Sequence, residues 1–164
     1  MTTTNGAKAL SSLLSGQTCR SAIGGAGAGS VITLGFGESI ERPKPLSNQL
    51  LTEFERQYEQ EINLVVFCAW RLAKHDSVTF SWRDTPSSGL TDCLGNLCGH
   101  TVQQAHVDCV SFDMKLEFSG ELVLHIFCDV TNNSESDENY YISDRGSIHS
   151  VGICSIYQGA ESKS

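Results

Sequence analysis

Short runs in which apolar and polar residues alternate recur along this chain and favour a fold built from antiparallel β-strands. Met114–Phe118 alternates strictly, Ser119-Gly120 follows as a tight turn, and Leu122–Phe127 continues as a second, more apolar run. This is the pattern of a β-hairpin, because successive side chains on a strand point to opposite faces. Further strands are expected at residues 17–23, 31–37, 62–70, 78–82, 101–109, 140–143 and 148–157. We therefore expect a mainly β (α+β) fold, an antiparallel curved sheet or barrel-like meander.

One or two helices are expected beside the strands. Ala7–Leu14 fits a short helix near the start of the chain. Leu46, Leu50, Phe54 and Tyr58 recur every four residues, which predicts one face of a helix over residues 47–60. Alternation over residues 51–61 also fits an edge strand, so both assignments stay open. Pro86–Cys98 is rich in Ser, Gly, Asn and Asp and is expected to be a loop.

The length and composition fit one globular domain over residues 1–164. The chain has 164 residues, of which 40% are hydrophobic, enough for a core of its own. Residues 1–6 and 159–164 are expected to be frayed ends. No secretory signal or bilayer-spanning run is visible, and the seven cysteines are an odd number. These features predict a cytoplasmic protein with reduced thiols and no membrane partner.

The charge is acidic and unevenly distributed. Eleven basic and nineteen acidic residues give a net charge of −8, which argues against a large phosphate-binding face and predicts no nucleic-acid partner. Between Thr101 and Asp144 the chain holds nine acids and one base, Lys115. This half is expected to present a negative surface. Such a surface serves solubility or steers association with a basic partner.

No pattern of residues predicts catalysis, a cofactor or a metal site. Gly24–Gly29 precedes a strand and lacks the lysine of a phosphate loop, so a turn between strands is expected. A cluster of possible zinc ligands, Cys93, Cys98, His100, His106 and Cys109, matches no common zinc spacing. On a strand, His106 and Cys109 would also point to opposite faces. The five histidines (His75, His100, His106, His125 and His149) accompany no nucleophile motif.

Acidic and aromatic residues meet around an expected polar loop at residues 132–137. The acids Asp129, Glu135, Asp137 and Glu138 lie in or beside this loop. Tyr140 and Tyr141 follow on a strand, where neighbours face opposite ways, so one of them should be exposed. Aromatic and acidic side chains together suit the binding of a basic protein. Trp70 and Trp82, by contrast, are expected to face the core.

Three stretches together resemble a group of small bacterial proteins, the immunity proteins of contact-dependent growth inhibition and related polymorphic toxin systems. They are Phe67–Leu72, the hairpin Leu116–Asp129 and the segment Ser136–Tyr140, within residues 62–143. The resemblance implies a cytoplasmic protein that binds and neutralises one cognate toxin domain, such as a nuclease. Its motifs are structural, so no functional residue is carried over.

Two other functions remain open from sequence. A small-molecule-binding β-barrel would need an apolar interior cavity, and an enzyme with a histidine-based site would need a pocket of converging histidines and acids. A dry, packed interior with an acidic face would favour the toxin inhibitor. The oligomeric state is not indicated by the sequence.

Overall fold

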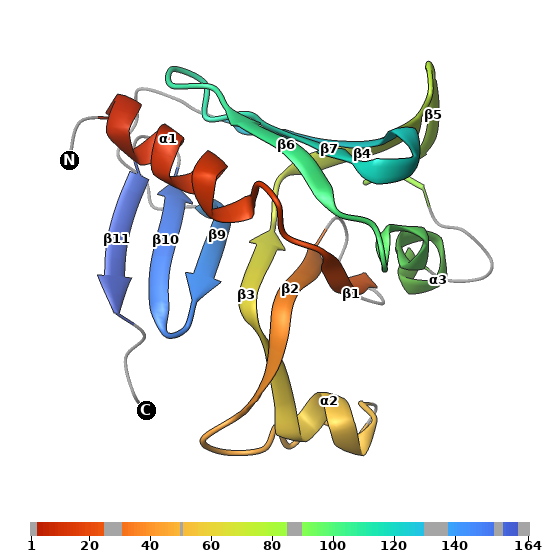
Figure 1. The fold of residues 1–164 in the computed structure, drawn as a ribbon, viewed down its shortest axis with the longest axis vertical. Coiled ribbons are helices and arrows are strands. Elements are labelled where there is room, and N and C mark those ends of the chain that lie inside the picture. Colours follow the sequence, from red (N-terminus) through yellow and green to blue (C-terminus); the bar gives the residue numbers. More distant parts are fainter. Residues whose placement is uncertain are drawn as a thin grey trace.

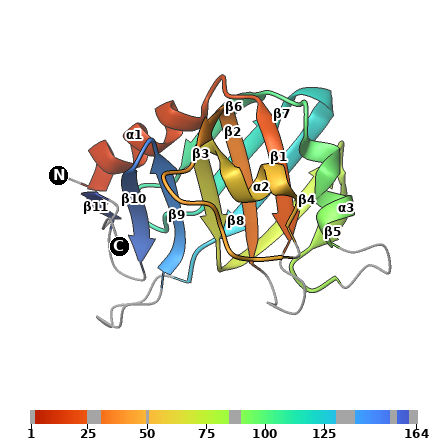
Figure 2. The same ribbon diagram turned by 90° about the horizontal axis from the view of Figure 1, so that it is seen from below.

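The chain folds into two antiparallel β-sheets that pack face to face, with helices at their edges (Figures 1 and 2). This is a computed structural model, and it describes residues 3–24, 31–49, 51–84, 90–129, 138–152 and 156–160. The mainly β, antiparallel architecture expected from the sequence is confirmed. The described strands form two separate sheets, and within them no closed barrel is found.

The strand order explains how the chain passes between the sheets. The six-stranded sheet runs β1 (Cys19–Gly24), β2 (Ile32–Glu41), β3 (Tyr58–Val66), β9 (Glu138–Asp144), β10 (Ser147–Gly152) and β11 (Ile156–Ala160). The five-stranded sheet runs β5 (Ser77–Ser81), β4 (Ala69–Lys74), β8 (Leu122–Phe127), β7 (Met114–Phe118) and β6 (Val102–Val107). The α-helices are α1 (Thr3–Leu14), α2 (Glu53–Gln57) and α3 (Leu90–Leu94), and the 3-10 turns are Gly95–Leu97 and Ser119–Glu121. The predicted hairpin is the β7–β8 pair, in which Leu116 lies opposite Leu124.

The core lies between the sheets because one face of each sheet is apolar. Leu34, Leu64 and Ile142 lie opposite one another across β2, β3 and β9, and all three are fully buried. Trp70 and Leu124 on the five-stranded sheet are fully buried as well, so the prediction for Trp70 is confirmed. These side chains fill the space between the sheets, as close-packed protein interiors require.

Helix α1 covers the free edge of the five-stranded sheet at β6 (Figure 1). The backbone N–H of Val107 donates to Ser11 Oγ over 3.1 Å, and that of Ala105 donates to Ser15 Oγ over 3.2 Å. Each serine hydroxyl in turn donates to the carbonyl oxygen four residues earlier, that of Ala7 or Ser11. The helix thus satisfies donors that an uncovered edge strand would offer to another chain. The short helix expected over Ala7–Leu14 is confirmed and begins earlier.

Two expected elements have different limits in the structure. The predicted length of the helix over residues 47–60 is wrong, because α2 covers only Glu53–Gln57 and β3 starts at Tyr58. A capping box between Thr52 and Glu55 begins this helix. Pairing of β3 with β2, where Glu41 lies opposite Tyr58, ends it. The single strand expected over residues 62–70 is also wrong, because the chain leaves one sheet after Val66 and enters the other at Ala69.

Three further expectations are corrected. Pro86–Cys98 contains α3 and a 3-10 turn rather than only loop, and Leu94 and Leu97 there are fully buried. Trp82 does not face the core: it follows the edge strand β5, is 39% exposed, and stacks under the Arg83 guanidinium. The expected frayed ends extend less far into the chain than predicted, since α1 begins at Thr3 and β11 reaches Ala160, while residues 1, 2 and 161–164 lie outside the described residues.

Candidate partner-binding surface

The predicted acidic loop has a well-defined base, at which Asn139 joins three segments of the chain. The backbone N–H of Asp129, just after β8, donates to Asn139 Oδ1 over 2.9 Å. The N–H groups of Phe67 and Cys68, between β3 and β4, donate to the Asn139 carbonyl oxygen over 2.9 and 3.2 Å. Asn139 itself is only 4% exposed. Two predicted site residues, Glu135 and Asp137, lie outside the described residues.

The two predicted tyrosines take opposite sides of β9. Tyr140 is fully buried, and its hydroxyl donates to the Phe112 carbonyl oxygen over 3.0 Å. Burial raises the pKa of the Tyr140 hydroxyl well above its usual value, with smaller contributions from Cys128, Cys68 and Asp113. Tyr140 is therefore a core residue. Tyr141 is half-buried on the outer face of the six-stranded sheet and is the tyrosine that a partner can reach.

Phe67 forms an aromatic pair with Tyr141 on this outer face. The two ring centroids are 6.0 Å apart and the rings are tilted by 39°. Phe67 is 39% exposed although the sequence places it within an apolar run. Sequence analysis missed it because the break between β3 and β4 depends on Asn139, which lies far along the chain. Exposed aromatic rings with restricted motion are common anchors in protein interfaces.

Two of the predicted acids lie at the same junction, since Glu138 precedes Asn139 and the Asp129 N–H donates to the Asn139 side chain. Asp129 and Glu138 are both exposed, and they flank the segment 130–137 at the ends of β8 and β9. Together Phe67, Asp129, Glu138 and Tyr141 form what we call the acidic aromatic surface. The surrounding backbone is fixed by the hydrogen bonds of Asn139, so these side chains extend from a rigid base.

Other acids of the Thr101–Asp144 segment have structural roles, so the acid count overstates the free negative charge. Asp113 Oδ1 accepts from the Cys128 N–H over 2.7 Å. Asp108 accepts from the N–H groups of Ser111 and Val110, and these hydrogen bonds lower the pKa of its carboxyl. Glu117 forms an ion pair with Lys115, and the Glu121 carboxylate contacts Nδ1 of His75. The candidate surface therefore depends on the acids at the loop base.

The outer face of the five-stranded sheet has a different character. Arg71, His125, Lys115 and His106 lie opposite one another in that order across β4, β8, β7 and β6. Partial burial lowers the pKa of His125, and the charges of Lys115 and Arg71 lower it further. Because Lys115 also pairs with Glu117, this row carries little net positive charge at neutral pH. It does not make the large basic face that nucleic-acid binding requires.

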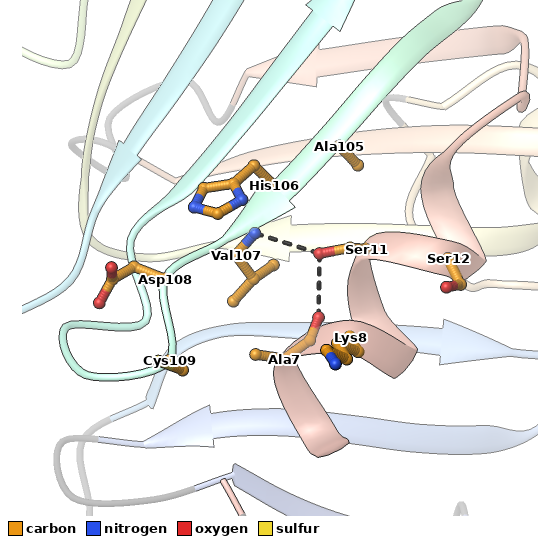
Figure 3. A pocket seen from close by; sticks show the side chains of 9 residues that line it. All are labelled: Ala7, Lys8, Ser11, Ser12, Ala105, His106, Val107, Asp108 and Cys109. Atoms are coloured by element: carbon orange, nitrogen blue, oxygen red, sulfur yellow. Dashed lines mark hydrogen bonds between the residues drawn. The ribbon is translucent and has the colours of Figure 1, made fainter. Parts of the chain in front are cut away.

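A groove of about 460 Å³ lies between α1 and β6, where a small ligand would fit by size. Figure 3 shows the side chains that line it. Its lining includes Lys8, Ser11, His106, Asp108 and Cys109. The carboxylate of Asp108 is held by its own turn, and the Ser11 hydroxyl is bonded to Ala7 and Val107. These two groups are therefore engaged in the fold.

A serine–histidine contact lies in the described part of the chain. There, the Ser119 hydroxyl contacts His100 Nδ1 at 3.0 Å, and the same oxygen accepts from the Thr101 N–H. His100 and Ser119 do not line the groove beside α1, and this contact joins the residues before β6 to the turn between β7 and β8. No group of three or more His, Cys, Asp or Glu residues that could hold a metal ion occurs among the described residues.

Comparisons with known proteins give no match from which a function could be inferred. No family model, no curated protein and no solved structure matches the chain. Within the described residues, no helix combines the length and apolar character needed to cross a bilayer. The resemblance of residues 62–143 to immunity proteins therefore stays a prediction.

Proposed function

We propose that this protein is a cytoplasmic inhibitor that binds and neutralises one cognate toxin domain, as an immunity protein does. The observation that carries the proposal is the acidic aromatic surface. There the ring centroid of the exposed Phe67 lies 6.0 Å from that of Tyr141, and the exposed acids Asp129 and Glu138 lie next to Asn139, which binds the Phe67 backbone. Rigid aromatic anchors next to acids suit the recognition of a basic protein surface.

A nuclease toxin is the partner class that this chemistry fits best. Enzymes that act on nucleic acids carry basic clefts because their substrates are polyanions. Acids at the loop base would attract such a cleft and speed the first encounter, which depends on long-range charge. Burial of the Phe67 and Tyr141 rings would then slow dissociation, because desolvated aromatic contacts supply much of the affinity of protein interfaces.

The two alternatives have weaker support. A ligand-binding barrel needs a hollow apolar interior, whereas the space between the two sheets holds Trp70, Tyr140 and Phe36, all fully buried. A histidine-based enzyme needs a histidine aligned with an acid and a nucleophile in a pocket. His106 borders the groove beside α1, but the neighbouring Ser11 and Asp108 groups are engaged in the fold.

The proposal is tested by co-expression with the toxin domain encoded next to its gene. Cells that produce both proteins should survive, and the two purified proteins should form a one-to-one complex. The double variant F67A/Y141A, produced at equal level and folded, should protect poorly. Cell death despite abundant folded wild-type protein, or the lack of any complex between purified components, would refute the proposal.

A further inference from the structure

The cysteines Cys68 and Cys128 lie opposite each other at the end of the β4–β8 ladder. In that ladder Trp70 pairs with Ile126, and Ala69 pairs with Phe127. One step further in the same register places Cys68 opposite Cys128. Both cysteines pack against the core on the inner side of the five-stranded sheet. The sequence separates them by sixty residues, so this pairing is visible only in the fold.

The backbone geometry at this pair is the kind that allows a disulfide. The N–H of Cys68 donates to the Asn139 carbonyl oxygen, and the N–H of Cys128 donates to Asp113 Oδ1. The two residues therefore do not use these N–H groups to bond to each other. Opposed residues at such a position in an antiparallel pair have Cα atoms about 4.5 Å apart. Disulfides span Cα separations of about 4.4–6.8 Å.

The two thiols also influence each other. Cys128 Sγ donates to the Phe112 carbonyl oxygen over 3.3 Å. The neighbouring Cys68 side chain and burial raise the pKa of the Cys128 thiol. Cys68 and Cys128 are both half-buried, so a small oxidant can approach the pair. Because a raised pKa disfavours the Cys128 thiolate, Cys68 is the sulfur that reacts first and Cys128 is the resolving thiol.

We propose that Cys68 and Cys128 form a dithiol site that is converted to a disulfide by a low-molecular-weight disulfide such as oxidised glutathione. The Cys68 thiolate attacks one sulfur of the oxidant and releases one glutathione thiolate, leaving a mixed disulfide. Cys128 then gives up its proton and attacks the Cys68 sulfur, which releases the second glutathione. Two protein S–H bonds are replaced by one S–S bond, and two electrons and two protons leave in two reduced glutathione molecules.

This chemistry is independent of the proposed toxin partner. The new bond would tie the β3–β4 junction to the end of β8 beside Asn139, and it would close a loop of about sixty residues. Such a link restricts the unfolded chain, so the oxidised protein should melt higher, by on the order of 10 °C. Of the other cysteines, Cys109 is exposed, and burial together with the neighbouring Cys98 raises the pKa of the Cys19 thiol to about 12.

Peptide mapping of the full-length protein tests the proposal directly. The reduced, folded protein is treated with oxidised glutathione, remaining thiols are alkylated after denaturation, and the products are digested with trypsin. Residues 57–71 contain Cys68 alone and residues 116–145 contain Cys128 alone, so a disulfide joins two diagnostic peptides. We expect this linked pair, its loss on treatment with reductant, and the higher Tm before reduction.

Matched variants make the test specific. C68A should abolish the linked peptides and leave Cys128 open to alkylation, whereas C93A, which changes a buried cysteine outside the pair, should retain the link. Mapping of the wild-type protein decides the question even where a variant fails to fold. The proposal is overturned when oxidised wild-type protein shows Cys68 and Cys128 both alkylated, both carrying glutathione, or joined to other cysteines.

Discussion

The Asn139 side chain holds the Asp129 backbone across the base of the acidic segment, with Oδ1 of Asn139 accepting the Asp129 N–H over 2.9 Å. Replacing Asn139 with Ala removes this acceptor from a site that is only 4% exposed. We expect N139A to lower the free energy of unfolding by about 1–3 kcal/mol, as for other lost buried hydrogen bonds. Urea denaturation measures the change. The exposed Asn96, which bonds the Cys93 carbonyl, is the control, and N96A should differ little from wild type. Equal effects of both variants would contradict this role.

The buried Tyr140 hydroxyl should stabilise the protein through its hydrogen bond to Phe112. Y140F keeps the ring and leaves the Phe112 carbonyl with the weaker thiol donor of Cys128. We expect a loss of roughly 1–2 kcal/mol in the free energy of unfolding. Y58F, at a half-buried tyrosine whose ring stacks on Phe54, is the matched control and should be nearly neutral. Thermal denaturation of the two variants measures the difference. A larger loss of stability in Y58F than in Y140F would contradict this assignment.

Ser11 and Ser15 should protect the edge of β6 by accepting its N–H groups. The double variant S11A/S15A keeps good helix formers in α1 but leaves two strand donors without these partners. We expect faster amide exchange at Ala105 and Val107 and a greater tendency to associate through the exposed edge. Exchange measured by NMR should be unchanged in S12A, whose side chain is exposed. Unchanged exchange in the double variant would show that α1 does not serve this purpose.

The stability of the protein should fall as His125 becomes protonated. Burial, Lys115 and Arg71 lower its pKa in the folded state, and Glu117 opposes them. The unfolded chain therefore binds the proton more readily, and stability decreases as the pH falls below the ordinary histidine pKa of about 6.5. H125Q should flatten this part of the curve of unfolding free energy against pH. The steeper loss below about pH 4, where Glu55, Glu61 and Asp108 with lowered pKa values take up protons, should persist.

The aromatic pair should control how long the toxin complex lasts. F67A and Y141A each remove an anchor from the acidic aromatic surface, so we expect dissociation to speed up by roughly 10- to 100-fold with little change in the association rate. W82A is the matched control, because Trp82 has the same exposed fraction as Phe67, 39%, but lies beyond β5 on the other sheet. Surface plasmon resonance separates the two rates. A larger effect of W82A would place the partner elsewhere.

Local sequence patterns predicted the strands well where pairing is local. The β7–β8 hairpin and the turn between β9 and β10 at Arg145-Gly146 connect neighbouring segments, so their signals lie within a few residues. The limits of β3 and β4 could not be predicted in this way. They are set by Asn139, which takes the N–H groups of Phe67 and Cys68 from more than seventy positions away.

The same difference between local signals and long-range contacts applies to the candidate site. Strand alternation places Tyr140 and Tyr141 on opposite sides of β9, but it does not say which one is buried, and Tyr141 is half-buried rather than exposed. That choice follows from register, because Tyr140 lies opposite the buried Val66 and Tyr141 opposite the half-buried Val65. Phe67 and the Cys68–Cys128 pair were missed since both depend on the chain crossing between sheets. The four-residue spacing of Phe54 and Tyr58 predicted a longer helix than the structure has. Tyr58 pairs with Glu41 of β2 and therefore belongs to a strand.

The association rate with the toxin domain, measured at several salt concentrations, tests the central claim most directly. D129K/E138K reverses both described acids of the acidic aromatic surface. The control E41K/D76K reverses two exposed acids elsewhere in the fold. Glu41 is the last residue of β2, and Asp76 lies in the turn between β4 and β5. We predict that the first variant associates at least about 10-fold more slowly at low salt and loses most of its salt dependence, while the control stays close to wild type. Equal rates for both variants, each matching wild type, would contradict the proposal that this surface binds the toxin.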